Sequence, residues 1–206
     1  MAAMAKKRAY HHGNLRQALI REAVRTIRTH GAEGLTLRAV GGRLGVSRTA
    51  LYRHFADKAA LLAAVAREGF QTFRSDLDQA WTAAGGGLAG FHAMGLAYVR
   101  FAVRNSAHYR VMFGEFREQC ERDPELIADA TAAFQVLVDA LLSLQRAGLA
   151  RSDDPEGLAR FIWACSHGIA MLTIDGQLGP DPSAGEALMR SSQPMLRRAL
   201  DAPPPR

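Results

Sequence analysis

Hydrophobic positions recur every three or four residues along most of the chain, which is the spacing of amphipathic helices. The first such pattern predicts a helix that Asn14 caps, that ends near His30 and that Gly31 terminates. Its buried stripe consists of Leu15, Leu19, Ala23 and Ile27. No segment alternates with a period of two for the length of a strand, so the pattern predicts an all-α protein of about nine helices.

Three further helices follow in close succession, over residues 36–44, 47–55 and 57–83. Thr36, Ser47 and Asp57 each stand where an N-cap side chain is expected. Two apolar pairs, Leu35 with Val40 and Val46 with Leu51, are spaced as hydrophobic staples. The first two of these helices are therefore expected to meet at a tight turn.

The remainder of the chain predicts a larger helical unit. Gly85-Gly86-Gly87 interrupts the chain, a polar stretch covers 115–123, and 179–182 forms a loop. Helices are expected over residues 88–105, 107–113, 124–147, 154–177 and 184–201. Asp154 followed by Pro155 is a typical helix start, whereas Pro194 predicts a kink or a break.

The charge is distributed unevenly along the 206 residues. The whole chain is +6, but residues 1–70 carry 13 basic and four acidic groups, a balance of +9, and residues 71–206 are −3. A basic segment of this kind indicates a polyanionic partner, most often nucleic acid, with a solvated basic face as the alternative.

Several protein classes are made improbable by composition. The two cysteines, Cys120 and Cys165, form neither a disulfide framework nor a zinc motif. No apolar signal core follows Lys6-Lys7-Arg8, and the longest apolar stretch, 161–174, has only 14 residues. We therefore expect a cytoplasmic protein without a membrane partner.

Residues 36–55 have the pattern of a helix-turn-helix, whose second helix enters the major groove of double-stranded DNA. Gly45 stands where the turn requires a positive φ. Gly41 stands where the two helices should approach closely. Val40, Leu44, Val46 and Leu51 are spaced to bury one face of each helix.

Two groups of polar residues are candidates for contacts with DNA. Arginine pairs bidentately with guanine, and Ser and Thr form less selective contacts with base edges. The base-contact candidates are Arg38, Ser47, Arg48 and Thr49. The phosphate-contact candidates are Thr36, Tyr52, Arg53, His54 and Lys58. A cation such as Lys58 in a first helical turn is disfavoured unless an anion binds there, although a solvated lysine remains the alternative.

The later helices offer a self-association face and a ligand pocket. The helix over 154–177 is apolar on two faces, so one face is expected to contact a partner subunit, unless the helix is central within one subunit. The candidates for this contact are Phe161, Ile162, Cys165, Gly168, Ile169 and Leu172. The pocket candidates, each of which could instead be ordinary core, are Phe91, Met94, Tyr98, Phe101, Met112, Phe113, Phe134, Trp163, His167 and Met171.

Motifs of enzymatic chemistry are missing. The sequence holds no Gly-x-Gly-x-x-Gly or Gly-x-x-x-x-Gly-Lys-Ser/Thr phosphate loop and no Gly-x-Ser-x-Gly elbow. We therefore expect neither an enzyme nor a bound cofactor or metal ion.

The segment from Tyr10 to Ala66 resembles the TetR family of bacterial transcriptional regulators. The resemblance rests on Tyr10-His-His-Gly-Asn-Leu-Arg16 and on Leu51-Tyr-Arg-His-Phe-Ala-Asp-Lys58, with the turn glycine between them. Trp163-x-x-x-His167-Gly168 and Tyr109-Arg-Val-Met-Phe113 resemble patterns of one group within the family. Gly42 departs from the pattern, because a helix-favouring residue is usual there.

The resemblance implies an all-helical homodimer with a basic arm at 1–9, a DNA-binding domain at 10–58 and a ligand-binding and dimerisation domain at 59–206. It also implies a palindromic operator and a small-molecule effector that releases the DNA, since most members are repressors. An activator or a ligand-independent regulator of the same fold remains an alternative. A helical small-molecule-binding protein or enzyme is a more distant one.

Overall fold

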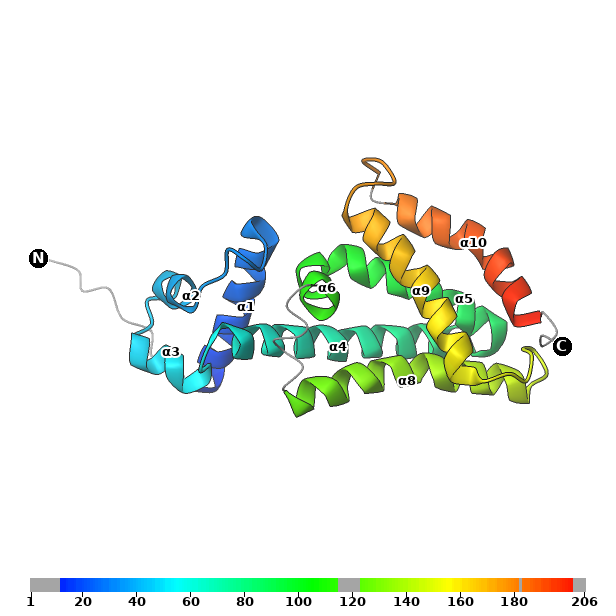
Figure 1. Ribbon diagram of the computed structural model, residues 1–206, viewed down its shortest axis with the longest axis horizontal. Coiled ribbons are helices and arrows are strands. Elements are labelled where there is room, and N and C mark those ends of the chain that lie inside the picture. Colours follow the sequence, from blue (N-terminus) through cyan, green and yellow to red (C-terminus); the bar gives the residue numbers. More distant parts are fainter. Residues whose placement is uncertain (1–11, 115–122, 182, 202–206) are drawn as a thin grey trace, which may run out of the picture.

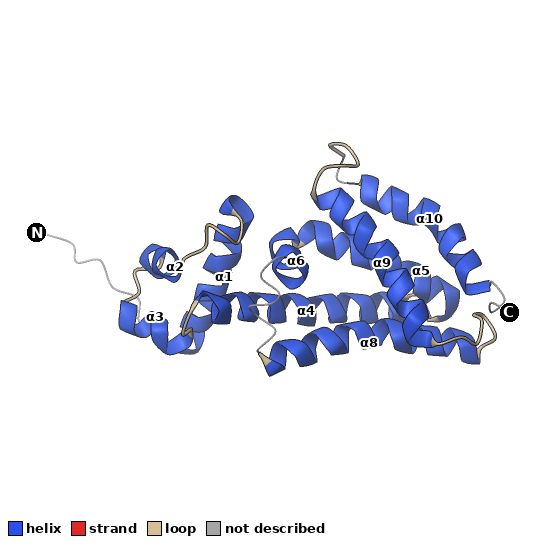
Figure 2. Ribbon diagram, viewed as in Figure 1, coloured by secondary structure: helices blue, strands red, loops and turns tan. Residues whose placement is uncertain are grey.

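The computed structural model describes residues 12–114, 123–181 and 183–201. All regular secondary structure in these ranges is helical, as Figure 2 shows, which confirms the predicted all-α class. The basic arm with Lys6, Lys7 and Arg8 lies outside the described residues, and so does most of the polar stretch that begins at Glu115.

The first three helices form a small module at one end of the molecule (Figure 1). They are α1 (His12–His30), α2 (Leu37–Arg43) and α3 (Arg48–His54). The predicted caps of α2 and α3 are confirmed, since Thr36 Oγ1 accepts from the Ala39 amide at 3.1 Å and Ser47 Oγ accepts from the Ala50 amide at 3.3 Å.

The first helix begins earlier than predicted. It starts at His12, so Asn14 lies inside α1 rather than at its N-cap. Neither His12 nor Gly13 is a proline, so the helical backbone can begin before Asn14, the polar residue that resembles a cap. The end at His30 is as predicted, with Gly31 at a φ of +71°.

The long helix α4 (Lys58–Ala83) runs out of this module and along the rest of the molecule (Figure 1). Asp57 Oδ1 accepts from the Ala60 amide at 2.8 Å and so caps α4 as predicted. The helices that pack around α4 and one another are α5 (Gly87–Arg104), α6 (Ser106–Phe113), α8 (Pro124–Arg146), α9 (Pro155–Ile174) and α10 (Ala184–Asp201).

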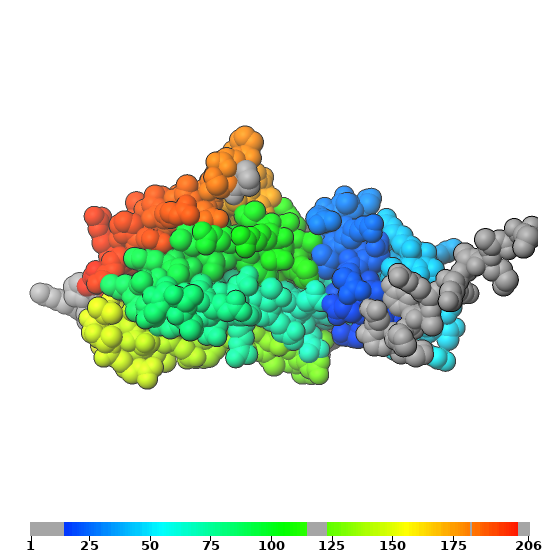
Figure 3. Space-filling view, turned by 180° about the vertical axis from the view of Figure 1, so that it is seen from behind, coloured from blue at the N-terminus to red at the C-terminus, as the bar shows by residue number. Residues whose placement is uncertain are grey.

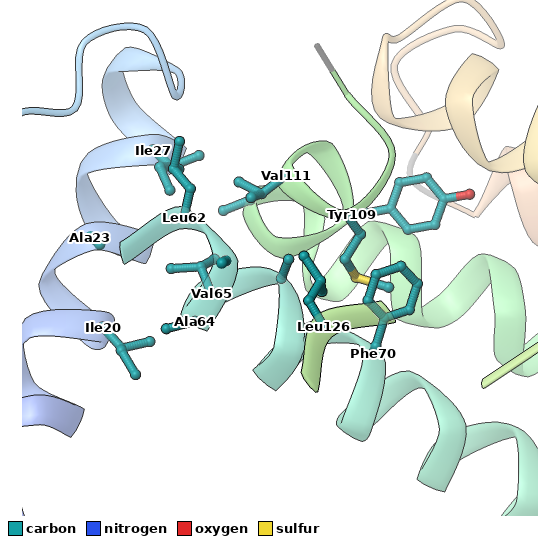
Figure 4. Close-up of a cluster of buried hydrophobic side chains, with 14 of the residues drawn as sticks. Ile20, Ala23, Ile27, Leu62, Ala64, Val65, Phe70, Tyr109, Val111 and Leu126 are labelled. Atoms are coloured by element: carbon teal, nitrogen blue, oxygen red, sulfur yellow. The ribbon is translucent and has the colours of Figure 1, made fainter. Parts of the chain in front are cut away.

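One hydrophobic core connects the module to the larger bundle. Figure 4 shows Leu62 and Val65 of α4 beside Ile27 of α1, with Val111 of α6 close to the same group. These four side chains are at most 3% exposed. The space-filling view in Figure 3 likewise shows the blue surface of α1 in contact with the green surface of the bundle. Because the core is continuous, a displacement of α6 or α4 is transmitted to α1.

The end of α9 and the effect of Pro194 in α10 differ from the sequence prediction. Helix α9 ends at Ile174 instead of Gln177, because Gly176 adopts a φ of +70° and the amide of Gln177 turns back to the Leu172 carbonyl at 2.9 Å. Pro194 does not break α10, which continues to Asp201.

Helices α8 and α9 are long and apolar enough, by length and composition alone, to cross a membrane. Here α8 packs on α4, and α9 packs on α5 and α10. Core helices of soluble proteins have the same length and composition, so this property does not indicate a membrane protein.

Candidate nucleic-acid interface and ligand cavity

The turn between α2 and α3 has the geometry of a helix-turn-helix. Gly45 adopts a φ of +63°, and the amide of Val46 donates to the Gly41 carbonyl at 2.9 Å. A Cβ on Gly41 would lie 3.1 Å from Cδ2 of Leu51. The close approach at Gly41 is therefore made by a side chain of α3 and not by its backbone. A side chain larger than that of glycine at this position would require Leu51 to shift.

Contacts from α1 hold both helices of the motif in position. Arg43 of α2 donates to Glu22 at 3.2 Å and to Thr26 Oγ1 at 2.9 Å, and both of these partners are buried in α1. The guanidinium of Arg16 lies over the ring of Phe55 at 5.2 Å. The orientation of α3 is therefore fixed by groups outside the motif itself.

Most of the candidate DNA-contact residues are exposed. Exposed side chains are Thr36, Arg38, Ser47, Arg48, Thr49, Tyr52 and Arg53. The hydroxyls of Thr36 and Ser47 accept from backbone amides as caps, so each retains its own proton for donation to a phosphate or a base. His54 and Lys58 are half-buried.

Two of these residues have defined partners in the absence of DNA. The guanidinium of Arg48 lies 5.6 Å from the centre of the Tyr52 ring, and this stacking orders a long side chain at the start of α3. The ammonium of Lys58 donates to the backbone carbonyl of Glu33 at 3.1 Å. This hydrogen bond fixes the position of the Lys58 ammonium at the start of α4.

The bundle encloses a cavity of about 610 Å³, within the size range of small-molecule sites. Side chains from six helices, α4, α5, α6, α8, α9 and α10, form its wall. The aromatic residues of this wall are Phe70, Phe73, Phe91, Tyr98, Phe113, Phe134 and Trp163. Its polar residues are His92, Thr131, Arg160, Ser166 and Gln193.

The structure divides the ten pocket candidates into two groups. Those that line the cavity are Phe91, Met94, Tyr98, Phe113, Phe134 and Trp163. Phe101, Met112, His167 and Met171 lie outside the lining. Phe101 packs on Phe73 with ring centres 5.0 Å apart, and the sulfur of Met112 occupies the space that a Cβ on Gly69 would need.

The pocket candidates from the sequence included none of the wall that α4 provides. Phe70, Phe73 and Leu77 line the cavity from that helix, and their spacing of three and then four residues was a signal that could have identified them. Ser166 and Gln193 carried no comparable signal, because a single polar residue in an apolar helix face does not reveal which space it borders.

A buried hydrogen-bond chain extends from the cavity wall to α6. The indole of Trp163 donates to the Tyr98 hydroxyl at 3.0 Å, and this hydroxyl lies 2.9 Å from that of Tyr109. The Tyr109 hydroxyl lies 2.7 Å from Nδ1 of His167. The chain therefore joins α9, α5 and α6 through polar groups at the edge of the cavity.

One direction of donation satisfies every group in this chain. Indole nitrogen only donates, so Tyr98 accepts from Trp163, donates to Tyr109, and Tyr109 donates to His167. The reverse direction would leave the Tyr98 proton only the longer contact with Nδ1 of His167, at 3.5 Å. Burial lowers the pKa of His167 and raises the pKa of both tyrosines, so the neutral forms that this direction needs are favoured.

A second polar cluster joins α1, α4 and α6. Glu68 of α4 accepts from the side-chain amide of Gln17 in α1 at 2.6 Å, and its other oxygen lies 3.4 Å from Nε2 of His108 in α6. The contact with His108 is the main cause of the lowered pKa of Glu68, and the bond from Gln17 adds to it. The module and α6 therefore share a carboxylate.

The self-association candidates on α9 point to both sides of the helix. Phe161 and Leu172 are exposed, and Cys165 and Gly168 are half-buried on the same stripe. Ile162 and Ile169 are instead buried within the chain, Ile162 at the cavity and Ile169 against Met189 and Leu196. A helix that is apolar all round does not reveal which face is internal, and the packing of α10 decides it here.

Two family models match the chain. One, described as bacterial regulatory proteins of the tetR family, matches residues 19–65. The other, the C-terminal domain of tetracyclin repressor-like proteins, matches residues 91–193. Together they cover the helix-turn-helix module and most of the bundle.

Curated relatives share the module alone. The chain is 51% identical over 51 residues to the tetracycline repressor protein class C of Escherichia coli, which is 25% of this chain and 23% of that protein. It is 44% identical over 55 residues to the transcriptional repressor AcnR of Corynebacterium efficiens, which is 27% of this chain and 29% of that protein. The matches thus span about a quarter of the length of these relatives.

Solved structures are similar over almost the entire chain. A protein of unknown function from Rhodococcus sp. RHA1 is 30% identical with a TM-score of 0.83, over 95% of this chain and all of that one. A regulatory protein of the tetR family from Rhodococcus RHA1 is 19% identical with a TM-score of 0.72, over 90% and 96% of the two chains. The second similarity establishes a shared fold.

Proposed function

The chain belongs to the TetR family of bacterial transcriptional regulators, and from that premise we propose that it is a repressor that binds a palindromic operator as a homodimer and releases it when a small molecule enters the cavity. The observation that carries this proposal is the combination of an exposed basic recognition helix with a 610 Å³ cavity in one continuous core. The cavity favours ligand control over ligand-independent regulation. The repressors among its relatives favour repression over activation.

In this proposal α3 enters the major groove, and its N-terminal residues Arg48 and Thr49 contact base edges. Thr36, Tyr52 and Lys58 contact the phosphates on either side and fix the register of α3 on the duplex. Ser47 and Arg38 border the same groove. Such a protein needs neither a cofactor nor catalytic chemistry, and it acts in the cytoplasm, where the chromosome is accessible.

We assign dimerisation to the exposed stripe of α9. Phe161 is 50% exposed and Leu172 is 38% exposed, and Met195 of the adjacent α10 is 70% exposed. Large apolar side chains at this level of exposure are typical of a surface that a second subunit covers. A two-fold axis there would place two α3 helices on successive major grooves, about 34 Å apart.

The route from ligand to DNA runs through α6. A ligand in the cavity contacts Tyr98 and Trp163, whose hydrogen-bond chain includes Tyr109 on α6. Val111 of the same helix packs against Leu62 and Ile27, at the base of the module (Figure 4). A shift of α6 therefore changes the angle of α1 to α4 and with it the separation of the two α3 helices.

The proposal is tested by selecting bound duplexes from a random DNA library with the full-length protein. It predicts enrichment of a two-fold symmetric sequence whose half-sites are separated by about one helical turn. Enrichment of an asymmetric site, or of no sequence, would contradict it.

A further inference from the structure

The charges around the cavity restrict the ligand that it accepts. Among the lining residues in the described part of the chain, Arg160 is the single Lys, Arg, Asp or Glu. His92 is the other lining residue that can become positively charged. Its pKa is lowered mainly by burial and further by the charge of Arg197. Neither residue carries a negative charge, so the lining offers no counter-ion for a positively charged ligand.

A buried cation without a partner is strongly disfavoured, because it loses its hydration and gains no opposite charge. Aromatic faces could in principle compensate by cation–π contact. The rings here are largely engaged with one another, since Phe113 and Phe134 pack against Trp163 with ring centres 6.1 Å and 6.2 Å apart. The positive charge of Arg160 adds repulsion.

Arg160 lies at the rim of the cavity, where its side chain is 62% exposed. Its guanidinium pairs with Glu156, one turn earlier in α9, at 2.8 Å. An exposed pair of this type contributes little to stability. An entering anion can therefore replace Glu156 as the partner of Arg160 at small cost. The planar donors of the Arg160 guanidinium match a carboxylate in two-point contact.

We propose that the ligand is an amphipathic anion, with an apolar body in the aromatic cavity and a carboxylate or similar head group on Arg160. This inference rests on the proposed function, because it names the ligand class of the same cavity. The hydroxyl of Ser166, which is buried in the wall, and the side-chain amide of Gln193 offer the body of the ligand two neutral polar contacts. A ligand with a positive head group is excluded by the same charges.

The test compares three probes that share one saturated alkyl chain: decanoate, decan-1-ol and decyltrimethylammonium. Binding to the full-length protein without DNA is followed by the fluorescence of Trp163 in a Trp81→Phe background, because Trp81 lies outside the lining. Decanoate should bind at one molecule per chain, and decyltrimethylammonium about tenfold more weakly, the effect of one charge-assisted contact.

Arg160→Gln should weaken decanoate binding about tenfold and leave decan-1-ol unchanged. Arg190→Gln is the matched control, since Arg190 also pairs with a glutamate one turn earlier, at 2.9 Å, but lies outside the lining. Tighter binding of the cationic probe, no binding of decanoate, or equal effects of the two substitutions would overturn the inference. None of these outcomes changes the result expected from the DNA selection. Failure of the DNA selection would likewise not change the result expected from the probes. The proposed ligand class and the proposed operator binding can therefore fail separately.

Discussion

The hydroxyl of Tyr109 lies 2.7 Å from Nδ1 of His167 and thereby joins α6, which packs on the DNA-binding module, to α9, which forms part of the ligand cavity. Tyr109 is fully buried, so its hydroxyl depends on Tyr98 and His167 for hydrogen-bond partners.

Replacement of Tyr109 by phenylalanine should therefore destabilise the fold. The substitution removes two short buried hydrogen bonds and leaves Tyr98 and Nδ1 of His167 only their 3.5 Å contact with each other, at a cost of about 1–3 kcal/mol. Urea unfolding measures the change in free energy. Tyr52→Phe serves as the control, because Tyr52 is exposed and should change stability by less than about 0.5 kcal/mol. Equal effects of the two substitutions would refute a structural role for the chain.

Acidification should also act through His167. Burial lowers the pKa of this histidine in the folded state, so between that pKa and 6.5 the unfolded chain binds more protons than the folded one. Stability should thus fall as the pH drops from 7.5 to about 5.5. His92 contributes in the same direction, so His167→Asn should reduce the pH dependence without removing it. If the unfolding free energy of His167→Asn changed between pH 7.5 and pH 5.5 by as much as that of the parent, this would show that His167 does not titrate in this way.

Phosphate anchoring can be separated from base recognition at Lys58. Loss of the ammonium group in Lys58→Ala should weaken binding to all duplexes about equally and reduce the slope of log affinity against log salt by about 1. Arg74→Ala is the control, because Arg74 is exposed on α4 outside the motif and should leave the slope unchanged. A loss confined to one DNA sequence would assign Lys58 a base contact.

The dimer face can be tested with a charge at Phe161. Phe161→Glu should shift the protein toward the monomer in analytical ultracentrifugation, because a carboxylate would be buried at the interface without a partner. Ile127→Glu on α8 is the control for an added charge away from α9, since Ile127, at the cavity, is 51% exposed and Phe161 is 50% exposed. The far-ultraviolet circular dichroism of both variants should match the parent. A dimer that tolerates Glu at position 161 would place the interface elsewhere.

The local features of the fold could be predicted from the sequence. Thr36, Ser47 and Asp57 cap their helices as expected, and Gly45 makes the turn, because such signals depend on neighbours within one helical turn. The contact of Arg43 with Glu22 could not be predicted, because 21 positions separate the two residues and Glu22 lies outside the helix-turn-helix motif.

The composition of the cavity was only partly predictable for a related reason. Phe73 and Phe101 are equally apolar and both periodic, yet Phe73 borders the cavity and Phe101 lies behind it. Ile162 and Phe161 are adjacent, and their opposite burial depends on where α10 packs. Periodicity identifies a buried face, but the space that this face borders depends on tertiary packing.

The most direct test of the account measures the ratio of affinities for the selected operator and for a scrambled duplex, at one salt concentration, in the parent protein and in Arg48→Ala. If α3 lies in the major groove with Arg48 on a base edge, the substitution should reduce this ratio. The loss should correspond to about 1–3 kcal/mol in the difference between the two binding free energies, and binding to the scrambled duplex should be nearly unchanged. An unchanged ratio in Arg48→Ala, with the fold intact, would contradict the assignment of α3 as the recognition helix.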